Sequence, residues 1–140
     1  MVLELTSDVG VVLVVARVLV GGILAFMGLN HFMNVEQMSG YAQSKGVPAP
    51  SLAVLFSGGQ LVAGGLAVVF GVYPALGAGA LALFFVIVTP AMHDFWAIDD
   101  PEQRQQEMTN FLKNVALLGA SLAFLVLAGG DWPYAVNLAL

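Results

Sequence analysis

Four long runs of apolar residues constrain this chain more than any other feature of its sequence. They cover residues 9–32, 51–70, 74–92 and 111–128. Each is close to the roughly 20 residues that an α-helix needs to cross the hydrocarbon core of a bilayer. A helix also satisfies its own backbone hydrogen bonds, which lipid cannot do for an irregular segment. The sequence therefore predicts an all-α membrane protein, an antiparallel bundle of four transmembrane helices that forms one domain over residues 1–140.

The composition of the chain agrees with this prediction. Only 9% of the residues are charged and 59% are hydrophobic, whereas a soluble domain carries about 25% charged residues. The lipid bilayer is therefore the expected solvent of the outer surface. Lys and Arg together number four and the formal net charge is −5, which excludes a basic nucleic-acid-binding surface. The absence of cysteine excludes disulfides, thiolate metal sites and a CxxC redox pair.

The connections between the runs predict how the helices are joined. Only Gly71, Val72 and Tyr73 separate the second run from the third, so these two runs form a tight helical hairpin. Residues 34–44 have apolar side chains at helical spacing, which predicts a short interfacial helix. Another is expected at residues 99–109, which open with Asp-Asp-Pro-Glu, a typical helix start, and can continue into the fourth run.

The few cations are distributed unevenly along the chain. Lys45, Arg104 and Lys113 all lie on the side of the two longer connections. The positive-inside rule then places both termini outside a multi-pass protein of the plasma membrane. The first ten residues contain Glu4 and Asp8 but no Lys or Arg. They lack the positive segment of a signal peptide, so the first run is interpreted as a retained helix.

Small residues predict where the helices contact one another. In lipid, small side chains spaced four apart let two helix backbones approach closely and gain dispersion energy. Three such pairs lie in the second and third runs: Gly59 with Ala63, Ala75 with Gly79, and Ala78 with Ala82.

Two polar residues lie inside the apolar runs, where desolvation makes them costly. Arg17 is about 12 Å into the first helix, and the runs contain no acid that can pair with it. Either it extends to the near interface, toward Asp8 or Asp131, or it points inward, to bind an anionic or carbonyl-bearing ligand or to join a buried polar network. Gln60 is interpreted as a hydrogen-bonding residue between helices, at a depth where it can meet Arg17.

A second group of polar residues lies at the side of the longer connections. His31 is four helical turns after Arg17 and so shares its helix face. Polar residues at the ends of three helices predict a ligand-binding pocket. If Arg17 points inward, Arg17 and Gln60 also belong to this pocket. The expected lining residues at these ends are Asn30, His31, His93, Asp94, Trp96, Asn110, Lys113 and Asn114.

Several chemical roles remain open for these residues. Histidine exchanges protons near neutral pH, so His31, His93 and Lys113 are the candidate catalytic residues. The alternative is that they anchor the helix ends at the membrane surface, the role that we expect for Trp96 and Trp132. No metal site is predicted, because the spacing of the two histidines and Asp94 follows no recognised ligand pattern.

Motifs in all four runs point to one family. The first run has Arg17 and then Gly-Leu-Asn-His-Phe at residues 28–32, and the second has Gln60-Leu with paired glycines four residues later. The third ends in His-Asp-Phe-Trp at residues 93–96, and the fourth opens with Phe-Leu-Lys-Asn at residues 111–114. Over about residues 10–130 the chain resembles the DoxX family of small four-helix membrane proteins. One departure is Gln60, which stands where the family usually has an acid and leaves Arg17 without a counter-charge.

The resemblance implies a membrane subunit or anchor of a redox assembly. Relatives look like the quinone-reducing subunit of a thiosulfate:quinone oxidoreductase, or like membrane partners of a superoxide dismutase and a sulfurtransferase. No motif for flavin, haem or an iron–sulfur cluster is present, so a quinone is the expected ligand and a soluble or membrane partner chain is the expected electron donor. A homo-oligomer or a complex subunit is expected. A non-catalytic assembly or chaperone factor and an oligomeric small-solute carrier remain alternatives, and enzymatic activity is left undecided.

Overall fold

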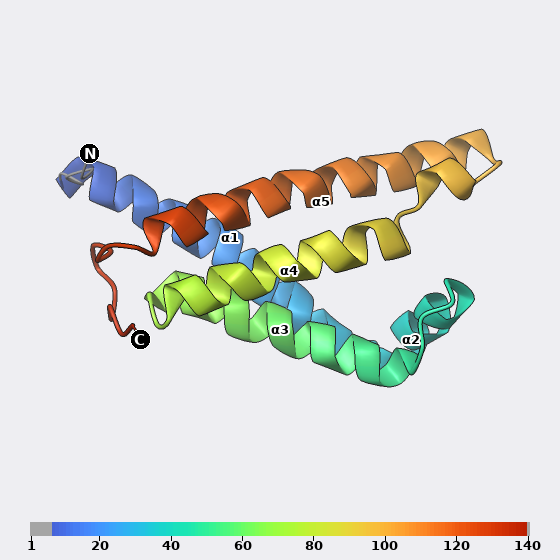
Figure 1. Cartoon of the computed structure of the whole chain (residues 1–140), viewed down its shortest axis with the longest axis horizontal. Coiled ribbons are helices and arrows are strands. Elements are labelled where there is room, and N and C mark those ends of the chain that lie inside the picture. Colours follow the sequence, from blue (N-terminus) through green and yellow to red (C-terminus); the bar gives the residue numbers. More distant parts are fainter. Residues whose placement is uncertain (1–6, 140) are drawn as a thin grey trace.

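The described part of the chain is helical almost throughout. The computed structural model describes residues 7–139. The short helix α2 (Val35–Ser44) and the 3-10 turn η1 (Phe95–Ala97) lie between longer helices. The four long helices are long and apolar enough to cross a membrane, which confirms the prediction of an all-α membrane protein: α1 (Ser7–Met33), α3 (Pro50–Phe70), α4 (Pro74–Met92) and α5 (Pro101–Leu127) (Figure 1).

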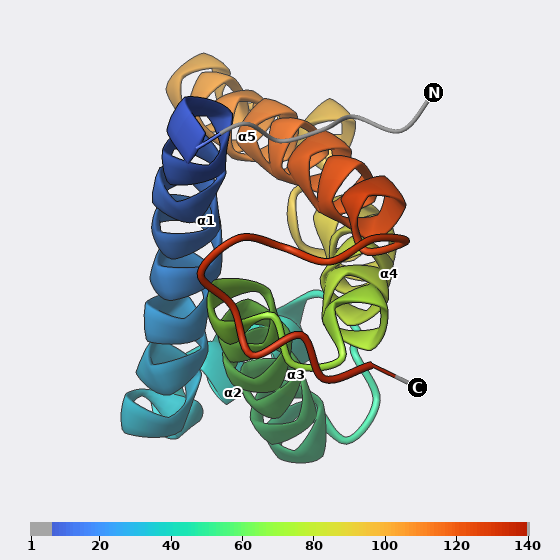
Figure 2. The ribbon, with the colours of Figure 1, turned by 90° about the vertical axis from the view of Figure 1, so that its left-hand side faces the viewer.

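The long helices pack in the order α1, α3, α4, α5. Helix α3 packs against both α1 and α4, and α4 packs against α5. Viewed along the bundle, these helices surround a common interior (Figure 2). Within the described residues, α1 and α5 share little interface. The most deeply buried apolar side chains come from the three helices that pack in series: Leu24, Leu61, Val68, Leu81 and Phe85.

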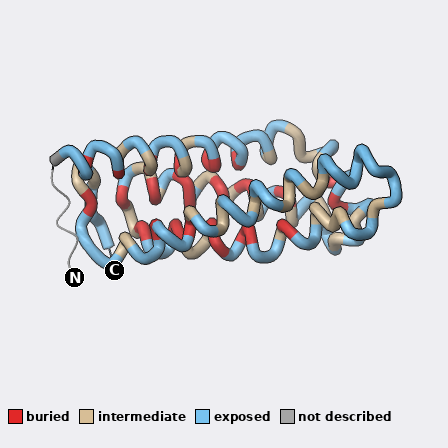
Figure 3. Tube along the Cα trace, turned by 90° about the horizontal axis from the view of Figure 1, so that it is seen from above, coloured by how far each residue is buried: buried red, intermediate tan, exposed pale blue. Residues whose placement is uncertain are grey.

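The outer faces of the helices are apolar. Phe56 is 74% exposed, Ile87 58% and Val126 80%. Buried residues form short stretches on the inner side of each helix, and exposed residues cover the outside (Figure 3). Helix α5 buries only Ser121 and Phe124. Exposing this much apolar surface to water is unfavourable by roughly 25 cal/mol per Å², a cost that lipid removes.

Paired glycines bring α1 and α3 into backbone contact. A Cβ atom on Gly65 would lie 2.4 Å from the carbonyl oxygen of Gly21, and one on Gly21 would lie 2.5 Å from that of Gly65. A Cβ on Gly28 would lie 2.6 Å from the carbonyl oxygen of Gly58. The two glycines of each helix are seven residues apart, which is close to two turns, so both contacts lie on one face.

The prediction that contacts follow pairs spaced four apart was wrong for two of the three pairs. Ala63 and Ala75 are exposed, and a Cβ on Gly79 would meet no atom within 4 Å. Ala78 and Ala82 are buried as expected. The tightest contacts repeat after seven residues, because two full turns return a side chain to the same face of a helix that packs lengthwise against its neighbour.

The helix boundaries follow local signals. Asp100 caps α5, since its carboxylate accepts a hydrogen bond from the backbone N–H of Gln103 at 3.3 Å, and Pro101 follows at the first helical position. The predicted helix at residues 99–109 therefore continues into the fourth span without a break. Pro90 lies inside α4 but only two residues before its end at Met92.

A substitution pair tests the glycine contact. We expect Gly65→Ala to destabilise the fold by about 1–3 kcal/mol, because the new methyl group would push two backbones apart. Gly79→Ala, in open space on α4, should be neutral or stabilise by up to about 1 kcal/mol. Unfolding in mixed micelles, followed by circular dichroism, measures both. Equal costs for the two variants would contradict the backbone contact between α1 and α3.

Candidate functional site

Arg17 points into the bundle and is 2% exposed. Its Nε donates to the carbonyl oxygen of Val68 at 3.2 Å, and its Nη2 donates to that of Val69 at 2.6 Å. From the other side, the carbonyl oxygens of Pro133 and Tyr134 accept from Nη1 at 2.6 Å and from Nη2 at 3.4 Å. Of the predicted alternatives, the structure has the buried polar network.

The end of α3 supplies the negative charge density that Arg17 lacks from an acid. Val68 and Val69 lie in the last turn of α3, where carbonyl oxygens have no partner within the helix. The helix macrodipole places partial negative charge at this end, which favours a cation there. The guanidinium therefore caps α3 and, within the described residues, forms no ion pair with Asp8 or Asp131.

Trp132 is buried, so the prediction that it anchors the chain at the membrane surface was wrong. It is 2% exposed, and its indole Nε1 donates to the carbonyl oxygen of Leu127 at 2.8 Å. Its ring packs edge-on against Phe124, and the Arg17 guanidinium lies 5.3 Å from the ring centroid. Burial is more favourable for Trp132 than a position at the membrane surface, because its indole N–H has a hydrogen-bond partner and its ring also stacks on a cation. Trp96, by contrast, is 54% exposed.

Gln60 forms a hydrogen bond between helices. Its Nε2 donates to the carbonyl oxygen of Ala80 in α4 at 2.7 Å. Arg17 bonds to α3 eight and nine residues beyond Gln60, about 12 Å away along the helix. The two side chains therefore do not meet.

A polar cluster forms where α2, the end of α4 and the start of α5 come together. The Nδ1 atom of His93 lies 2.7 Å from Oε2 of Glu107, and Asn110 Nδ2 donates to Oε1 of the same carboxylate at 3.5 Å. Lys45 Nζ donates to Oδ1 of Asp94 at 2.5 Å. We call these residues, together with Tyr41, the polar cluster.

The polar cluster is partly exposed. The side chains of His93 and Glu107 are 22% and 15% exposed, and those of Lys45 and Asp94 are 18% and 29% exposed. An ionised Glu107 carboxylate can only accept, so His93 Nδ1–H is then the donor of this hydrogen bond. His93 Nε2 has no hydrogen-bond partner among the described residues, so this nitrogen is left to bond to a group outside the cluster.

The pKa values of Lys45 and Tyr41 are both raised by their surroundings in the polar cluster. The hydrogen bond to the Asp94 carboxylate raises the pKa of Lys45 above its ordinary value of 10.5. Burial raises the pKa of Tyr41, and the charge of Glu107 adds to the effect. Tyr41 therefore keeps its proton, which its hydroxyl donates to the carbonyl oxygen of Met92 at 3.2 Å.

Three aromatic rings adjoin the polar cluster. Phe95 and Trp96 of η1 pack against Phe111 of α5, with ring centroids 5.3–5.8 Å apart and near-perpendicular planes. This contact joins the turn after α4 to α5.

The structure brings together only part of the predicted pocket. His93, Asp94 and Asn110 belong to the polar cluster, and Trp96 lies beside it. On α1, His31 Nδ1 lies 2.9 Å from the carbonyl oxygen of Met27.

The remaining predicted residues lie apart from the cluster. The ring of His31 packs edge-on against Phe84 in α4. Asn30 accepts a hydrogen bond from Asn34. Lys113 is exposed and Asn114 half-buried, and neither side chain bonds to another described residue.

Three residues of the polar cluster were missing from the predicted pocket. Tyr41 lies on α2 and Lys45, four residues later, directly follows this helix, while Glu107 lies three residues before Asn110 on α5. Residues at these spacings share a helix face. The sequence shows this spacing, but it does not show that α2 contacts the end of α4.

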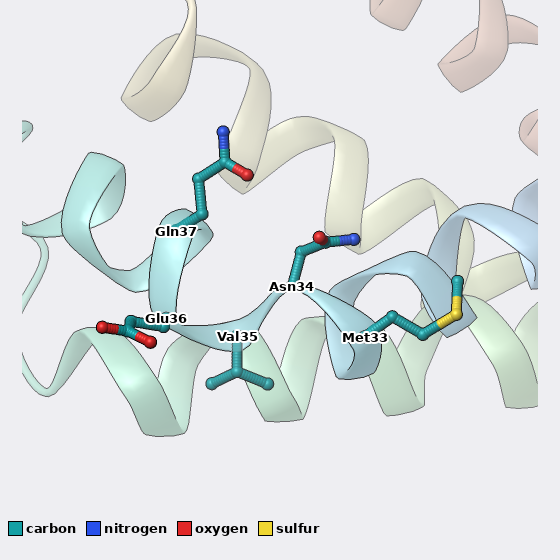
Figure 4. Close-up of a pocket in the computed structure, with 5 residues that line it drawn as sticks. All are labelled: Met33, Asn34, Val35, Glu36 and Gln37. Carbon is teal, nitrogen blue, oxygen red and sulfur yellow. The ribbon is translucent and has the colours of Figure 1, made fainter.

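The surface hollows do not coincide with the polar cluster. One hollow, of about 440 Å³, lies at the corner between α1 and α2 and is lined by the five consecutive residues 33–37. Asn34 and Gln37 extend to one side of the ribbon and Val35 to the other, so these side chains do not converge on one point (Figure 4). A second, of about 150 Å³, lies beside Tyr73 at the opposite end of the bundle. Among the described residues, no three His, Asp or Glu side chains are grouped to hold a metal ion.

A family model described as DoxX matches residues 12–94, more than half of the chain. The chain belongs to the DoxX family. The matched region contains Arg17, Gln60 and His93, and it ends before α5, so the similarity of residues 111–114 to the family stays a prediction. Neither the curated proteins nor the solved structures include a match to this DoxX protein.

The pair of Lys45 and Asp94 gives a testable pH dependence. Because the Lys45 pKa is raised, the ammonium stabilises the fold fully below pH 10.5 and loses this effect as the pH rises through the folded value. We expect Asp94→Asn to lower the Lys45 pKa toward 10.5. Titration of the lysine ¹³Cε signal by NMR measures it, with Lys113, the other lysine of the chain, as the reference signal. An unchanged Lys45 titration would rule out the ion pair.

Proposed function

We propose that this DoxX protein is the membrane subunit of a quinone-linked redox assembly, in which the polar cluster supplies protons to a quinone. The observation that carries the proposal is the pair of His93 and Glu107, held at 2.7 Å and partly exposed at one end of the bundle. A quinone in the bilayer reaches such a site from the lipid, where its apolar tail remains dissolved.

The cluster has the groups that quinone reduction needs from a protein. A quinone takes up protons along with electrons, and its carbonyl oxygens accept hydrogen bonds. His93 Nε2 can donate to such an oxygen, and Glu107 holds the opposite ring nitrogen at 2.7 Å, which fixes the orientation of the imidazole. The aromatic side chain of Trp96, 54% exposed, offers a flat surface for the quinone ring.

The electrons come from a partner in this proposal. No motif of the chain binds a redox cofactor, so a partner chain carrying a flavin or a metal centre donates them. Its docking surface is the start of α5, where residues 101–106 are exposed and polar. In the plasma membrane, with the spanning helices antiparallel, α2 lies along the surface on the cytoplasmic side, as the positive-inside rule favours for Lys45 and Arg104.

Fluorescence quenching tests the proposed site without the partner. A short-chain benzoquinone that binds beside Trp96 should quench its emission, and His93→Gln should raise the Kd about tenfold through the loss of one hydrogen bond. Trp96→Phe should remove the saturable quenching. Tyr134→Phe is the control, because its exposed side chain lies at the other end of the bundle. Equal Kd values for the native protein and His93→Gln would overturn the quinone site.

A second candidate is a non-catalytic anchor or assembly factor. The exposed polar turns at the start of α5 favour it, because a docking surface needs no ligand pocket. Native mass spectrometry of the gently extracted protein separates the two functions. A retained partner without quinone, unaffected by His93→Gln, would support the anchor, whereas a retained quinone would support the redox subunit.

A further inference from the structure

The segment after α5 crosses the end of the bundle and touches all four long helices. We call residues 129–139 the C-terminal strap. In the end-on view it leaves α5, passes toward α1 and then runs over α3 and the start of α4 (Figure 2). A Cβ on Gly10 of α1 would lie 3.1 Å from the ring of Pro133, so the strap contacts α1 there.

Backbone hydrogen bonds fasten the strap to α3 and α4. The N–H of Val136 donates to the carbonyl oxygen of Phe70, the last residue of α3, at 2.9 Å. The N–H of Tyr73, which precedes α4, donates to the carbonyl oxygen of Leu138 at 2.6 Å. A side chain on Gly71 would collide with Ala135, since the two Cβ atoms would be 2.6 Å apart. The strap therefore needs the glycine of the α3–α4 turn.

The strap also holds its own shape. Asn137 Oδ1 accepts from the N–H of Trp132 at 2.8 Å, and Asn137 Nδ2 donates to the carbonyl oxygen of Trp132 at 2.9 Å. Trp132 in turn is buried against Phe124 of α5. These contacts make the strap a closed loop tied to the end of α5.

Arg17 connects this loop to the opposite side of the bundle. Its guanidinium bonds to the strap carbonyls of Pro133 and Tyr134 and to the end of α3, and it lies over the ring of Trp132. Helices α1 and α5 otherwise share little interface in the described residues. Arg17 and the strap are thus the main link between them at this end.

We propose that Arg17 and the C-terminal strap form a latch that holds α1 and α5 together, and that its release opens the bundle between these two helices. Once the strap leaves, the guanidinium loses two of its four acceptors and the tryptophan face, so Arg17 stays bonded to α3 but no longer connects α1 to α5. The gap opens on the side where lipid meets the bundle interior.

Spin-label distances test the latch, because the chain has no cysteine that would compete for labelling. One label pair, Val12→Cys with Leu122→Cys, reports α1 against α5. The other, Leu66→Cys with Leu83→Cys, reports α3 against α4. All four positions are exposed. Double electron–electron resonance of the full chain in lipid gives the reference distributions.

We expect Arg17→Gln, and separately truncation after Gly130, to broaden the α1–α5 distribution and shift it by more than about 2 Å. The two changes combined should give no larger shift than either alone, because both open one latch. The α3–α4 distribution should stay unchanged. Arg104→Gln, on the exposed start of α5, is the matched control and should move neither pair.

Two results would overturn the proposal. One is an α1–α5 distribution that the truncation leaves unchanged, and the other is a pair of shifts that add in the combined variant. The truncated chain keeps Arg17 and its bonds to α3. Its α1–α5 distance distribution therefore tests the latch even if Arg17→Gln does not fold. Trp132→Leu gives a third reading, since it removes the stacked ring and should shift the α1–α5 distance less than truncation does.

Discussion

A guanidinium inside a bilayer cannot rely on water, and the position of Arg17 organises one whole end of the structure. Four backbone carbonyl oxygens accept hydrogen bonds from its guanidinium, two from the last turn of α3 and two from the C-terminal strap. The negative end of the α3 dipole supplies the negative charge density that this cation needs. The end of α3, the strap and the buried ring of Trp132 all meet at this one cation.

The two ends of the bundle solve the problem of polar groups in different ways. Around Arg17, permanent charge meets fixed backbone dipoles, and the side chain is almost fully buried. At the other end, an imidazole and a carboxylate, those of His93 and Glu107, pair at 2.7 Å, and both stay partly exposed. The first arrangement suits a structural lock. The second suits exchange of protons with a ligand or with water.

The candidate site shows which of its residues can be predicted from their spacing along the chain. Helix periodicity places Asn110, Lys113 and Asn114 on one face of the fourth run, yet only Asn110 bonds to the cluster. His93 and Asp94 join it from the turn that follows α4. His31 shares a face with Arg17 by the same rule, yet it lies on α1 and outside the cluster. The cluster joins α2, α4 and α5, and periodicity does not say which helices become neighbours.

The sequence by itself determined that four helices are long and apolar enough to cross a membrane, and roughly where each lies. The length of an apolar run is a local property of the chain, and lipid offers no hydrogen bonds to an irregular backbone. It also determined the family. Tertiary structure decided that glycines seven apart, Gly21 and Gly28, contact α3, that Arg17 bonds to carbonyls, and that Trp132 is buried. These outcomes depend on which backbone atoms other segments bring within about 3 Å, a distance set by packing between residues far apart in the chain.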